Sequence, residues 1–545
     1  MKTAELFVKC LENEGIEAIF GIPGEENLDV MDALLGSHIR FITTRHEQGA
    51  AFMADVYGRL TGKAGVCLAT LGPGATNLIT GVADANMDNA PVVAIAGQAA
   101  TTRLHKESHQ VLDLVSLFKP ISKYSAQIGE PEIVPEVVRK AFKVAQAEKP
   151  GCSFISFPEN IAEMEIENAV PLKVQSPSPP VPPLEKIDQA AKIISEAKYP
   201  IVMAGNGVVR AKASDQLVNF AEKLRIPVAS TFMAKGVIPY SHELSLGSVG
   251  LQAKDYVSCG IDRADVVICV GYDIVEYHPY LWNKNHKKCK IIHINTNPAE
   301  VDQYYIVEAG VMGDIGSALD RIAEKADHYK GSFSGSLRQA IVEEMDASKN
   351  DEGFPVKPQK IIYDLHEALN PGDIVICDVG AHKMWMARMF KAEKPNTCII
   401  SNGFASMGIA LPGAIAAKLA HPDKTALAVT GDAGFMMNCQ EIETAMRIGT
   451  PIIVLIWSDS EYGLIKWKQM NQFGRPSNIS FTNPDFVKFA ESFGAKGYRI
   501  ESSDQLAPTI KQAIKDNTVV IIDCPVDYKE NLKLTAKLGE LVCPI

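Results

Sequence analysis

Two aspartates in the last third of the chain stand where each could meet a cation or a phosphate. Asp432 follows the apolar run 425–430, and Asp459 follows a second apolar run, 451–457. In a parallel α/β sheet the carboxyl ends of neighbouring strands share one crevice, and ligands bind there. Two carboxylates beside the free amides of a helix N-terminus suit a divalent cation that bridges to a phosphate. The alternative is that both are ordinary turn and helix-capping residues.

A third acidic residue, Glu47, follows another predicted strand, 39–43, and opens a helix of small residues at 49–62. Its apolar neighbours make it a candidate for a carboxyl held away from water, where acid–base groups are found. The alternative is a solvated first-turn glutamate, which the helix dipole favours. Spacing alone leaves both interpretations open.

The overall composition narrows the function classes. The chain has 545 residues and a formal net charge of −11. Such an acidic chain is unsuited to nucleic acid or anionic membranes, so an anionic ligand would need local amides and a metal. The first residues do not read as a signal peptide, and no uncharged run has the length of a membrane span. The 11 cysteines are scattered singly, which predicts buried free thiols in a reducing cytoplasm.

Short apolar runs alternate with helix-period stretches along most of the chain, which is typical of βαβ units and parallel sheets. Stretches rich in proline and polar residues at 169–184 and 346–359 predict linkers. The fold class is therefore α/β, with three consecutive doubly wound domains of mainly parallel sheet. The predicted domains are 1–168, 185–345 and 360–530, followed by a tail at 531–545. The strands predicted for the first two domains are 17–20, 39–43, 65–71, 91–96, 152–157, 200–204, 227–230, 264–270 and 290–294.

The stretch 431–462 resembles the signature of the thiamine-diphosphate enzymes, and the three predicted domains resemble their pyrimidine-binding, middle and diphosphate-binding domains. This resemblance covers essentially the whole chain. It implies that Asp432, Asp459 and the backbone carbonyl of Glu461 hold Mg²⁺ on the diphosphate of the cofactor. We expect the helical pattern to resume at about Gln440, after a glycine-rich turn.

The signature departs from the family pattern at two positions. Ala433 stands where the family has glycine, and Ser458 stands in place of the first of two asparagines. Alanine allows a close backbone approach but is strained where φ is positive. Neither change removes a metal ligand. The further cofactor contacts that the resemblance implies in this stretch are Ala433, Gly434 and Tyr462.

Two motifs of the N-terminal block carry the same resemblance. Residues 45–48 (RHEQ) resemble the activating-glutamate motif, which implies that Glu47 hydrogen-bonds a pyrimidine nitrogen of the cofactor and promotes its imino tautomer. Such a carboxyl requires a water-poor site. The loop 72–77 resembles the GPG-x-x-N loop beside the pyrimidine pocket, with Gly74 and Asn77 as contacts, although a glycine loop alone would indicate a plain turn.

Two motifs of the C-terminal block complete the expected site. The stretch 378–385 resembles a G-x-H-x-M-W turn whose amides cap the terminal phosphate, whereas the alternative for His382 is capping of its own helix. In 401–412, Met407 matches the residue that wedges under the cofactor, and its alternative is an ordinary core position. The cofactor contacts implied by these two stretches are Ala381, His382, Ser406, Met407 and Gly408.

Within the superfamily, the chain resembles the catalytic subunit of acetolactate synthases. Gln110 matches a residue that assists at the bound substrate, and 271–283 resembles the FAD-independent catabolic type. The resemblance implies that one pyruvate is decarboxylated on thiamine diphosphate and condensed with a second to give 2-acetolactate and CO₂. Lys468 stands where the biosynthetic enzymes carry a tryptophan, so we expect pyruvate as acceptor. FAD stays open without being favoured, because the Arg-rich, Asp-rich loop of the FAD-containing biosynthetic type is not found in the sequence. Arg210 interrupts the glycine pattern after Gly205, which favours a tight turn there over a dinucleotide site.

The resemblance also implies a homodimer or homotetramer, with each site between the first domain of one subunit and the third of another. One alternative is a sibling enzyme that releases an aldehyde or uses another acceptor. A second is a non-catalytic paralogue that binds cofactor without turnover. The sequence does not distinguish acetoin formation from branched-chain amino acid biosynthesis.

Overall fold

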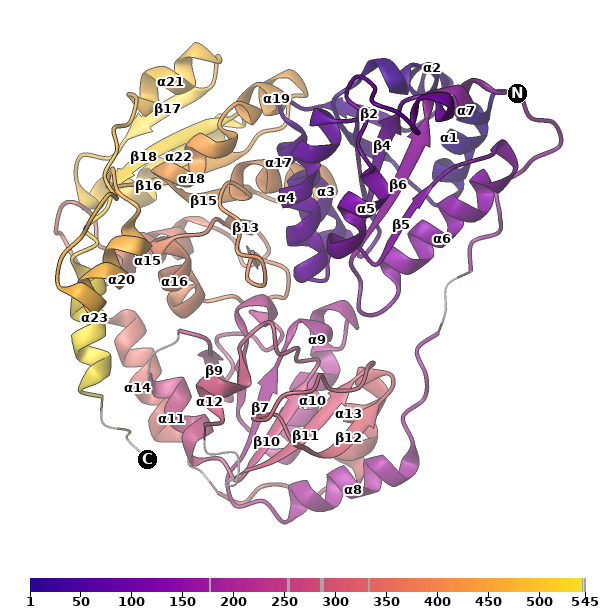
Figure 1. Ribbon diagram of the computed structural model, residues 1–545. Coiled ribbons are helices and arrows are strands. Elements are labelled where there is room, and N and C mark those ends of the chain that lie inside the picture. The colour runs from indigo at the N-terminus through magenta and orange to yellow at the C-terminus, as the bar shows by residue number, and fades with distance from the viewer. Residues whose placement is uncertain (176–177, 252–254, 285–288, 332–333, 542, 544–545) are drawn as a thin grey trace.

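The fold is built from three parallel sheets of six strands each, shown by a computed structural model in Figure 1. The structure describes residues 1–175, 178–251, 255–284, 289–331, 334–541 and 543. All the strand pairs within the sheets are parallel, and helices connect the strands. The prediction of an α/β fold with three parallel-sheet units is therefore confirmed.

The N-terminal sheet has the strand order β2-β1-β3-β4-β6-β5. Helix α3 (Glu47–Thr61) and helix α4 (Pro73–Met87) cover one face of this sheet. Successive residues of the central strand β3 point to opposite faces and so contribute to two different apolar clusters. Cys67 and Ala69 contribute to the cluster that contains α3 and α4, whereas Val66 contributes to the opposite cluster. The strands are β1 (Ala18–Gly21), β2 (Arg40–Thr43), β3 (Gly65–Ala69), β4 (Val92–Gln98), β5 (Tyr124–Gln127) and β6 (Cys152–Pro158).

The middle sheet has the order β12-β11-β10-β7-β8-β9 and lies below the other two in Figure 1. Its first helix after β7 is α9 (Asn206–Arg210), which begins in the predicted glycine turn. The helices that pack its outer face include α10 (Ser214–Leu224) and α13 (Ile315–Lys325). The strands are β7 (Pro200–Ala204), β8 (Val228–Ser230), β9 (Ser245–Ser248), β10 (Val266–Val270), β11 (Lys290–Asn295) and β12 (Val307–Met312).

The C-terminal sheet has the order β14-β13-β15-β16-β18-β17. Two apolar clusters join it to the rest of the molecule, one shared with the N-terminal domain and one with the middle domain. Helix α17 (Ala410–Ala420) packs against α3 across the first boundary, where both are seen side by side in Figure 1. The strands are β13 (Ile374–Cys377), β14 (Cys398–Ile400), β15 (Ala426–Gly431), β16 (Ile453–Ser458), β17 (Lys496–Arg499) and β18 (Val520–Pro525).

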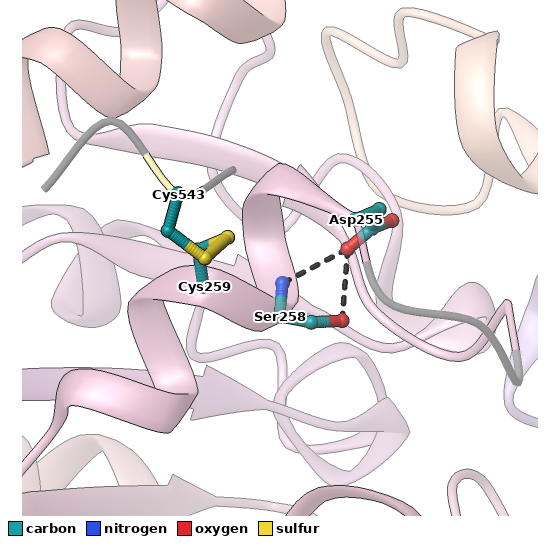
Figure 2. The surroundings of a disulfide bond; sticks show 4 residues. All are labelled: Asp255, Ser258, Cys259 and Cys543. Carbon is teal, nitrogen blue, oxygen red and sulfur yellow. Dashed lines mark hydrogen bonds between the residues drawn. A yellow bond between two sulfur atoms is a disulfide. The ribbon is translucent and has the colours of Figure 1, made fainter. Parts of the chain in front are cut away.

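The prediction that all cysteines are free thiols is wrong for one pair. Cys259 of α11 (Tyr256–Arg263) forms a disulfide with Cys543, 284 residues further along the chain (Figure 2). Cys543, which follows α23 (Glu530–Gly539) in the chain, is thereby linked to the middle domain. The other nine cysteines are free, and seven of these are buried. No helix in the described ranges combines the length and apolar content that crossing a membrane requires.

Candidate active site

Asp432 and Asp459 lie at the carboxyl ends of two neighbouring strands, as the spacing predicts. Strands β15 and β16 run in parallel, with Gly431 opposite Trp457. One carboxylate oxygen of Asp432, Oδ2, accepts the backbone N–H groups of Asp459 at 3.1 Å and Ser460 at 2.7 Å. The two strand ends are therefore joined at the point where the sequence analysis predicts a cation.

The glycine-rich segment after β15 is helical, which corrects the expectation that a turn precedes a helix at about Gln440. Helix α18 (Asp432–Asn438) begins directly at Asp432, and the separate helix α19 (Glu441–Arg447) follows. Ala433 therefore takes an ordinary helical φ, and no strain arises there. Gly434 is closely packed instead: a Cβ at this position would lie 3.1 Å from Thr430 Oγ1 and 3.2 Å from the carboxyl of Asp378, so these side chains would have to shift.

Asn483 is a member of this site that no spacing rule reveals. Its side-chain Nδ2 donates to Asp432 Oδ2 at 2.7 Å and to Ser460 Oγ at 3.2 Å. Its amide oxygen is buried and has no hydrogen-bond partner. An unpaired buried oxygen costs free energy. This atom is therefore available to coordinate a cation or to accept a hydrogen bond from a bound molecule.

The electrostatics of the site favour a bound cation. Burial, and then the nearby charge of Asp432, raise the pKa of Asp459 to about 7. A divalent ion between the two carboxylates would relieve this repulsion. No group of three or more His, Cys, Asp or Glu side chains is gathered for a metal in the described part of the chain. A cation here would therefore take backbone, amide or ligand oxygens in addition to the two carboxylates.

The segment after Asp459 presents Glu461 and Tyr462 beside the same strand end. The carbonyl oxygen of Glu461 accepts the N–H of Gly463 at 2.9 Å, which leaves its second lone pair free for a ligand. The side chain of Glu461 forms an ion pair with Lys466 and points to this partner. Tyr462 is 40% exposed and its ring contacts Phe481.

His382 lies between the ends of β13 and β15, in the first turn of α16 (Ala381–Met389). Both Ala381 and His382 are buried. A Cβ added to Gly380 would lie 2.7 Å from the imidazole, so only glycine fits under the ring. Burial lowers the pKa of His382 to about 3, and its Nε2 has no hydrogen-bond partner. A neutral imidazole with one open nitrogen faces the same strand ends as Asp432.

The turn with Ser406, Met407 and Gly408 is fixed from the end of β13. Asp378 Oδ1 accepts the N–H of Gly408 at 2.8 Å, and Asn438 at the end of α18 donates to the Gly408 carbonyl at 2.9 Å. Gly408 has φ of +91°, and a Cβ there would lie 2.7 Å from Asn438 Nδ2. Ser406 is buried and Met407 is half-buried.

In the N-terminal domain, Glu47 is 8% exposed at the start of α3. Asn77 Nδ2 donates to Glu47 Oε2 at 3.0 Å, so α3 and α4 meet at this carboxyl. A Cβ on Gly74 would lie 3.4 Å from Glu47 Oε1. The three residues predicted from two separate motifs are thus brought together.

Gln110 belongs to the same neighbourhood but is exposed. It lies in a turn with φ of +59°, not in a surface helix. Its backbone packs against Gly72, where a Cβ would lie 2.7 Å from the Gln110 carbonyl oxygen. The GPG loop therefore contacts Glu47 through Gly74 and Gln110 through Gly72.

Glu441 is a second residue that sequence reasoning missed. This fully buried carboxylate of α19 accepts the backbone N–H groups of Arg45 at 3.1 Å and His46 at 3.0 Å, directly before Glu47. It contacts residues almost 400 positions away, so no local signal marks it. Among the described residues, no hydrogen bond or ion pair joins Glu47 to Asp432 itself.

Comparisons with known proteins agree with this architecture. Residues 1–117 match the thiamine pyrophosphate enzyme N-terminal TPP binding domain, 187–322 the central domain, and 378–524 the C-terminal TPP binding domain. The fold and the site thus define a thiamine pyrophosphate enzyme. Three of its relatives narrow this class to one family.

The chain is 38% identical to an acetolactate synthase of Bacillus subtilis, over 99% of this chain and 96% of the relative. It is 36% identical to a probable acetolactate synthase large subunit of Methanocaldococcus jannaschii, over 99% and 94%. A catabolic acetolactate synthase of Raoultella terrigena is 34% identical, over 98% and 97%. The protein belongs to the acetolactate synthase family, and it is a thiamine-diphosphate-dependent enzyme of that type.

Proposed function

We propose that the protein decarboxylates pyruvate and condenses the two-carbon unit with a second pyruvate, giving 2-acetolactate and CO₂. The observation that carries this proposal is the similarity to acetolactate synthases over 98–99% of the chain. The geometry supports it, because Glu47 and Asp432 lie at helix starts and Asp459 directly follows the end of β16. An enzyme that releases an aldehyde, or uses another acceptor, is the competing function.

We propose Mg²⁺ as the metal, held by Asp432, Asp459 and the carbonyl of Glu461. Hard divalent cations take oxygen ligands, and these three groups supply them. The unpaired amide oxygen of Asn483 and the raised pKa of Asp459 both fit a cation at this point. The amide nitrogen of Asn483 would also orient the Asp432 carboxylate, as residues next to metal ligands commonly do.

The chain's own groups have separate tasks in this proposal. Thiamine diphosphate supplies the electron sink for decarboxylation. Glu47, buried and held by Asn77, shares a proton with a pyrimidine nitrogen, a role that requires exclusion of water. The amides at the start of α16 and α18 receive the phosphates. Gln110, exposed beside Gly72, hydrogen-bonds the substrate.

The turn carrying Ser406, Met407 and Gly408 contacts the pyrimidine ring in this proposal. Its backbone is fixed by Asp378 and Asn438, so it offers a pre-formed surface. Met407 is half-buried and supplies an adaptable apolar contact. Tyr462, Ala433 and Gly434 complete the diphosphate side.

We propose a homodimer or homotetramer in which a second copy completes each site. Large apolar side chains stay exposed at and beside the turn that carries Met407: Met436 and Met437 of α18 are 40% and 42% exposed, and Phe404 is 45% exposed. Exposed apolar side chains gathered at one site are typical of interaction surfaces. A cytoplasmic location agrees with the nine free thiols.

We propose that the enzyme works without FAD. In the middle domain, the carboxylate of Glu276 accepts the N–H of Asn206 at 3.0 Å, at the start of α9 between β7 and β10. This is the position at which a dinucleotide phosphate would bind in such a sheet. Because Glu276 occupies it, a flavin pyrophosphate finds no free amides there. The purified protein should show no flavin absorbance.

Product analysis tests the proposed reaction. The protein is incubated with pyruvate, thiamine diphosphate and Mg²⁺, and the products are identified by mass spectrometry. 2-Acetolactate, converted to acetoin by acid, is the expected product. Acetaldehyde as the direct product would favour a simple decarboxylase, and no turnover of any 2-oxo acid would favour a non-catalytic paralogue.

A further inference from the structure

Two aspartates at the end of α4 hold the turn that precedes Met407. Asp88 accepts the backbone N–H groups of Asn402, at 2.9 Å, and Gly403. Asp84 accepts the hydroxyl of Ser401 at 2.6 Å and the N–H of Ser406 at 3.3 Å. Both aspartates are fully buried. The turn belongs to the C-terminal domain, whereas its acceptors belong to the N-terminal domain.

A single arginine joins these two aspartates to the strand before the turn. Nη2 of Arg59, in the last turn of α3, lies 2.9 Å from an oxygen of Asp84 and 2.9 Å from an oxygen of Asp88. Its Nη1 donates to the carbonyl of Ile400, where β14 ends. Asp55 accepts hydrogen bonds from Nε and Nη2 of the same guanidinium. A buried arginine with all its partners in place is a rigid support.

The charges of this network are close to balance. Lys383, also buried, lies close enough for its charge to interact with Asp84 and Asp88. Burial raises the pKa of Asp84 well above its usual range, which favours its neutral form. Three carboxyl groups, Asp55, Asp84 and Asp88, thus share two basic side chains, Arg59 and Lys383. Unpaired buried charge would be costly, so loss of one member disturbs the others.

The turn needs this external support because its backbone is strained. Ala405 has φ of +58°, a left-handed conformation that costs free energy for a residue other than glycine. Gly408 also has a positive φ. Such conformations persist when surrounding groups determine them. The surrounding groups here are Asp84 and Asp88 at one end of the turn and Asp378 at the other.

We propose that Asp84 and Asp88 are positioning residues for the pyrimidine end of the cofactor site. They act through the backbone of residues 401–406 and set the place of Ser406, Met407 and Gly408. This inference rests on the proposed function, in which that turn contacts the pyrimidine. In the proposed assembly, α3 and α4 would then serve two cofactor sites: Glu47 and Asn77 near their N-termini would act in one, and this network at their C-termini would support the turn of the other.

Asp88→Asn tests the proposal, because an amide puts N–H donors where two backbone N–H groups need acceptors. Thiamine diphosphate affinity is measured by calorimetry with saturating Mg²⁺, and steady-state kinetics are measured with pyruvate. We expect an affinity loss of roughly 10-fold or more and a comparable loss in kcat, with little change in KM for pyruvate. Asp364→Asn is the matched control, a buried aspartate of the C-terminal domain that pairs with Lys360.

Ser401→Ala is the second variant and keeps every charge. It removes the hydroxyl that joins Asp84 to Ser406, so a smaller loss of cofactor affinity in the same direction is expected. If Asp88→Asn does not fold, Ser401→Ala decides. Unchanged affinity and kcat in folded variants, with only the unfolding temperature lowered, would overturn the positioning role. Failure of the unmodified protein to bind thiamine diphosphate would instead overturn the proposed function.

Discussion

Glu441 Oε1 accepts the backbone N–H of His46 at 3.0 Å, one residue before Glu47. A carboxylate of the diphosphate-binding domain thus holds the helix start that carries the proposed activating glutamate. The same α18–α19 unit begins with Asp432 and also bonds to Gln48 through Asn438. Within one chain, the helix start that carries Glu47 is therefore fixed to the helices that begin at Asp432, so in the proposed assembly two neighbouring cofactor sites are mechanically connected.

Glu441→Gln should weaken this connection. The amide group of glutamine would place a donor against the N–H of Arg45 or His46, which leaves a buried group unsatisfied and costs about 1–3 kcal/mol. We expect a lower midpoint of thermal unfolding and a reduced kcat. Glu443→Gln, next to it on α19 but half-exposed, is the control. Equal unfolding midpoints for both variants would contradict the role assigned to Glu441.

Glu47→Gln should abolish most turnover while leaving the fold and Mg²⁺ binding intact. Glutamine keeps the size of the side chain but cannot share a proton with the pyrimidine, and lost acid–base assistance is typically worth 10²–10⁴-fold, so we expect a kcat lower by about 100-fold or more. Steady-state kinetics with pyruvate measure it. Glu136→Gln, an exposed first-turn glutamate of α6 (Val134–Gln146), should retain full activity. Substantial activity of Glu47→Gln would show that this carboxyl is an ordinary helix-start residue.

Asp432→Asn should remove the metal response. In the unmodified protein, Mg²⁺ with thiamine diphosphate should raise the midpoint of thermal unfolding, because a ligand that binds only the folded state stabilises it. We expect no such rise for Asp432→Asn, since one ligand charge is lost. Asp485→Asn, which changes the N-cap of α21 (Phe486–Ser492), should keep the rise. The proposed metal site would be contradicted if EDTA left the binding of thiamine diphosphate to the unmodified protein unchanged.

Acid should destabilise the protein through His366. Burial lowers the pKa of His366 to about 4 from an ordinary 6.5, and its Nε2 accepts the N–H of Lys391 at 2.7 Å. The folded protein keeps this imidazole neutral, so its contribution is complete above pH 6.5 and is lost as the pH falls toward 4. The contribution amounts to at most about 3 kcal/mol. Denaturant unfolding across this pH range should show that the free energy of unfolding depends less on pH in His366→Asn than in the unmodified protein. An identical pH dependence in both proteins would contradict the role assigned to His366.

Loss of the disulfide between Cys259 and Cys543 should lower stability under oxidising conditions. Cross-links that close long loops typically contribute about 2–4 kcal/mol. Cys543→Ser should unfold at a lower temperature than the unmodified protein, and reductant should no longer change its midpoint. Cys439→Ser, at a half-buried free thiol, serves as control. A midpoint of the unmodified protein that does not respond to reductant would argue against the bond in solution.

The central strands were predictable, whereas several edge strands were not. Strands β7, β10 and β15 are apolar runs, because both of their faces are buried in parallel sheets. Strands β5 and β17, with the sequences YSAQ and KGYR, lie at sheet edges and carry polar residues that resemble loop sequence. Periodicity therefore predicts the sheet interior better than its margins.

The proposed site divides in a similar way. Asp432, Asp459 and Glu47 each follow an apolar run, so a strand-end argument finds them. Asn483 and Glu441 reach their partners only through tertiary contacts, over 51 and 395 residues. The helical start at Asp432 was missed because glycine and aspartate are also typical of turns.

Mixed assemblies test most directly whether Glu47 and the Asp432 site serve one cofactor from two subunits. Glu47→Gln and Asp432→Asn chains, each inactive alone, are co-expressed with different tags, and assemblies containing both are isolated. In a two-fold symmetric dimer one site then combines an intact Glu47 with an intact Asp432, so about half of the normal activity should return. Mixed assemblies that bind thiamine diphosphate but stay inactive would contradict the account.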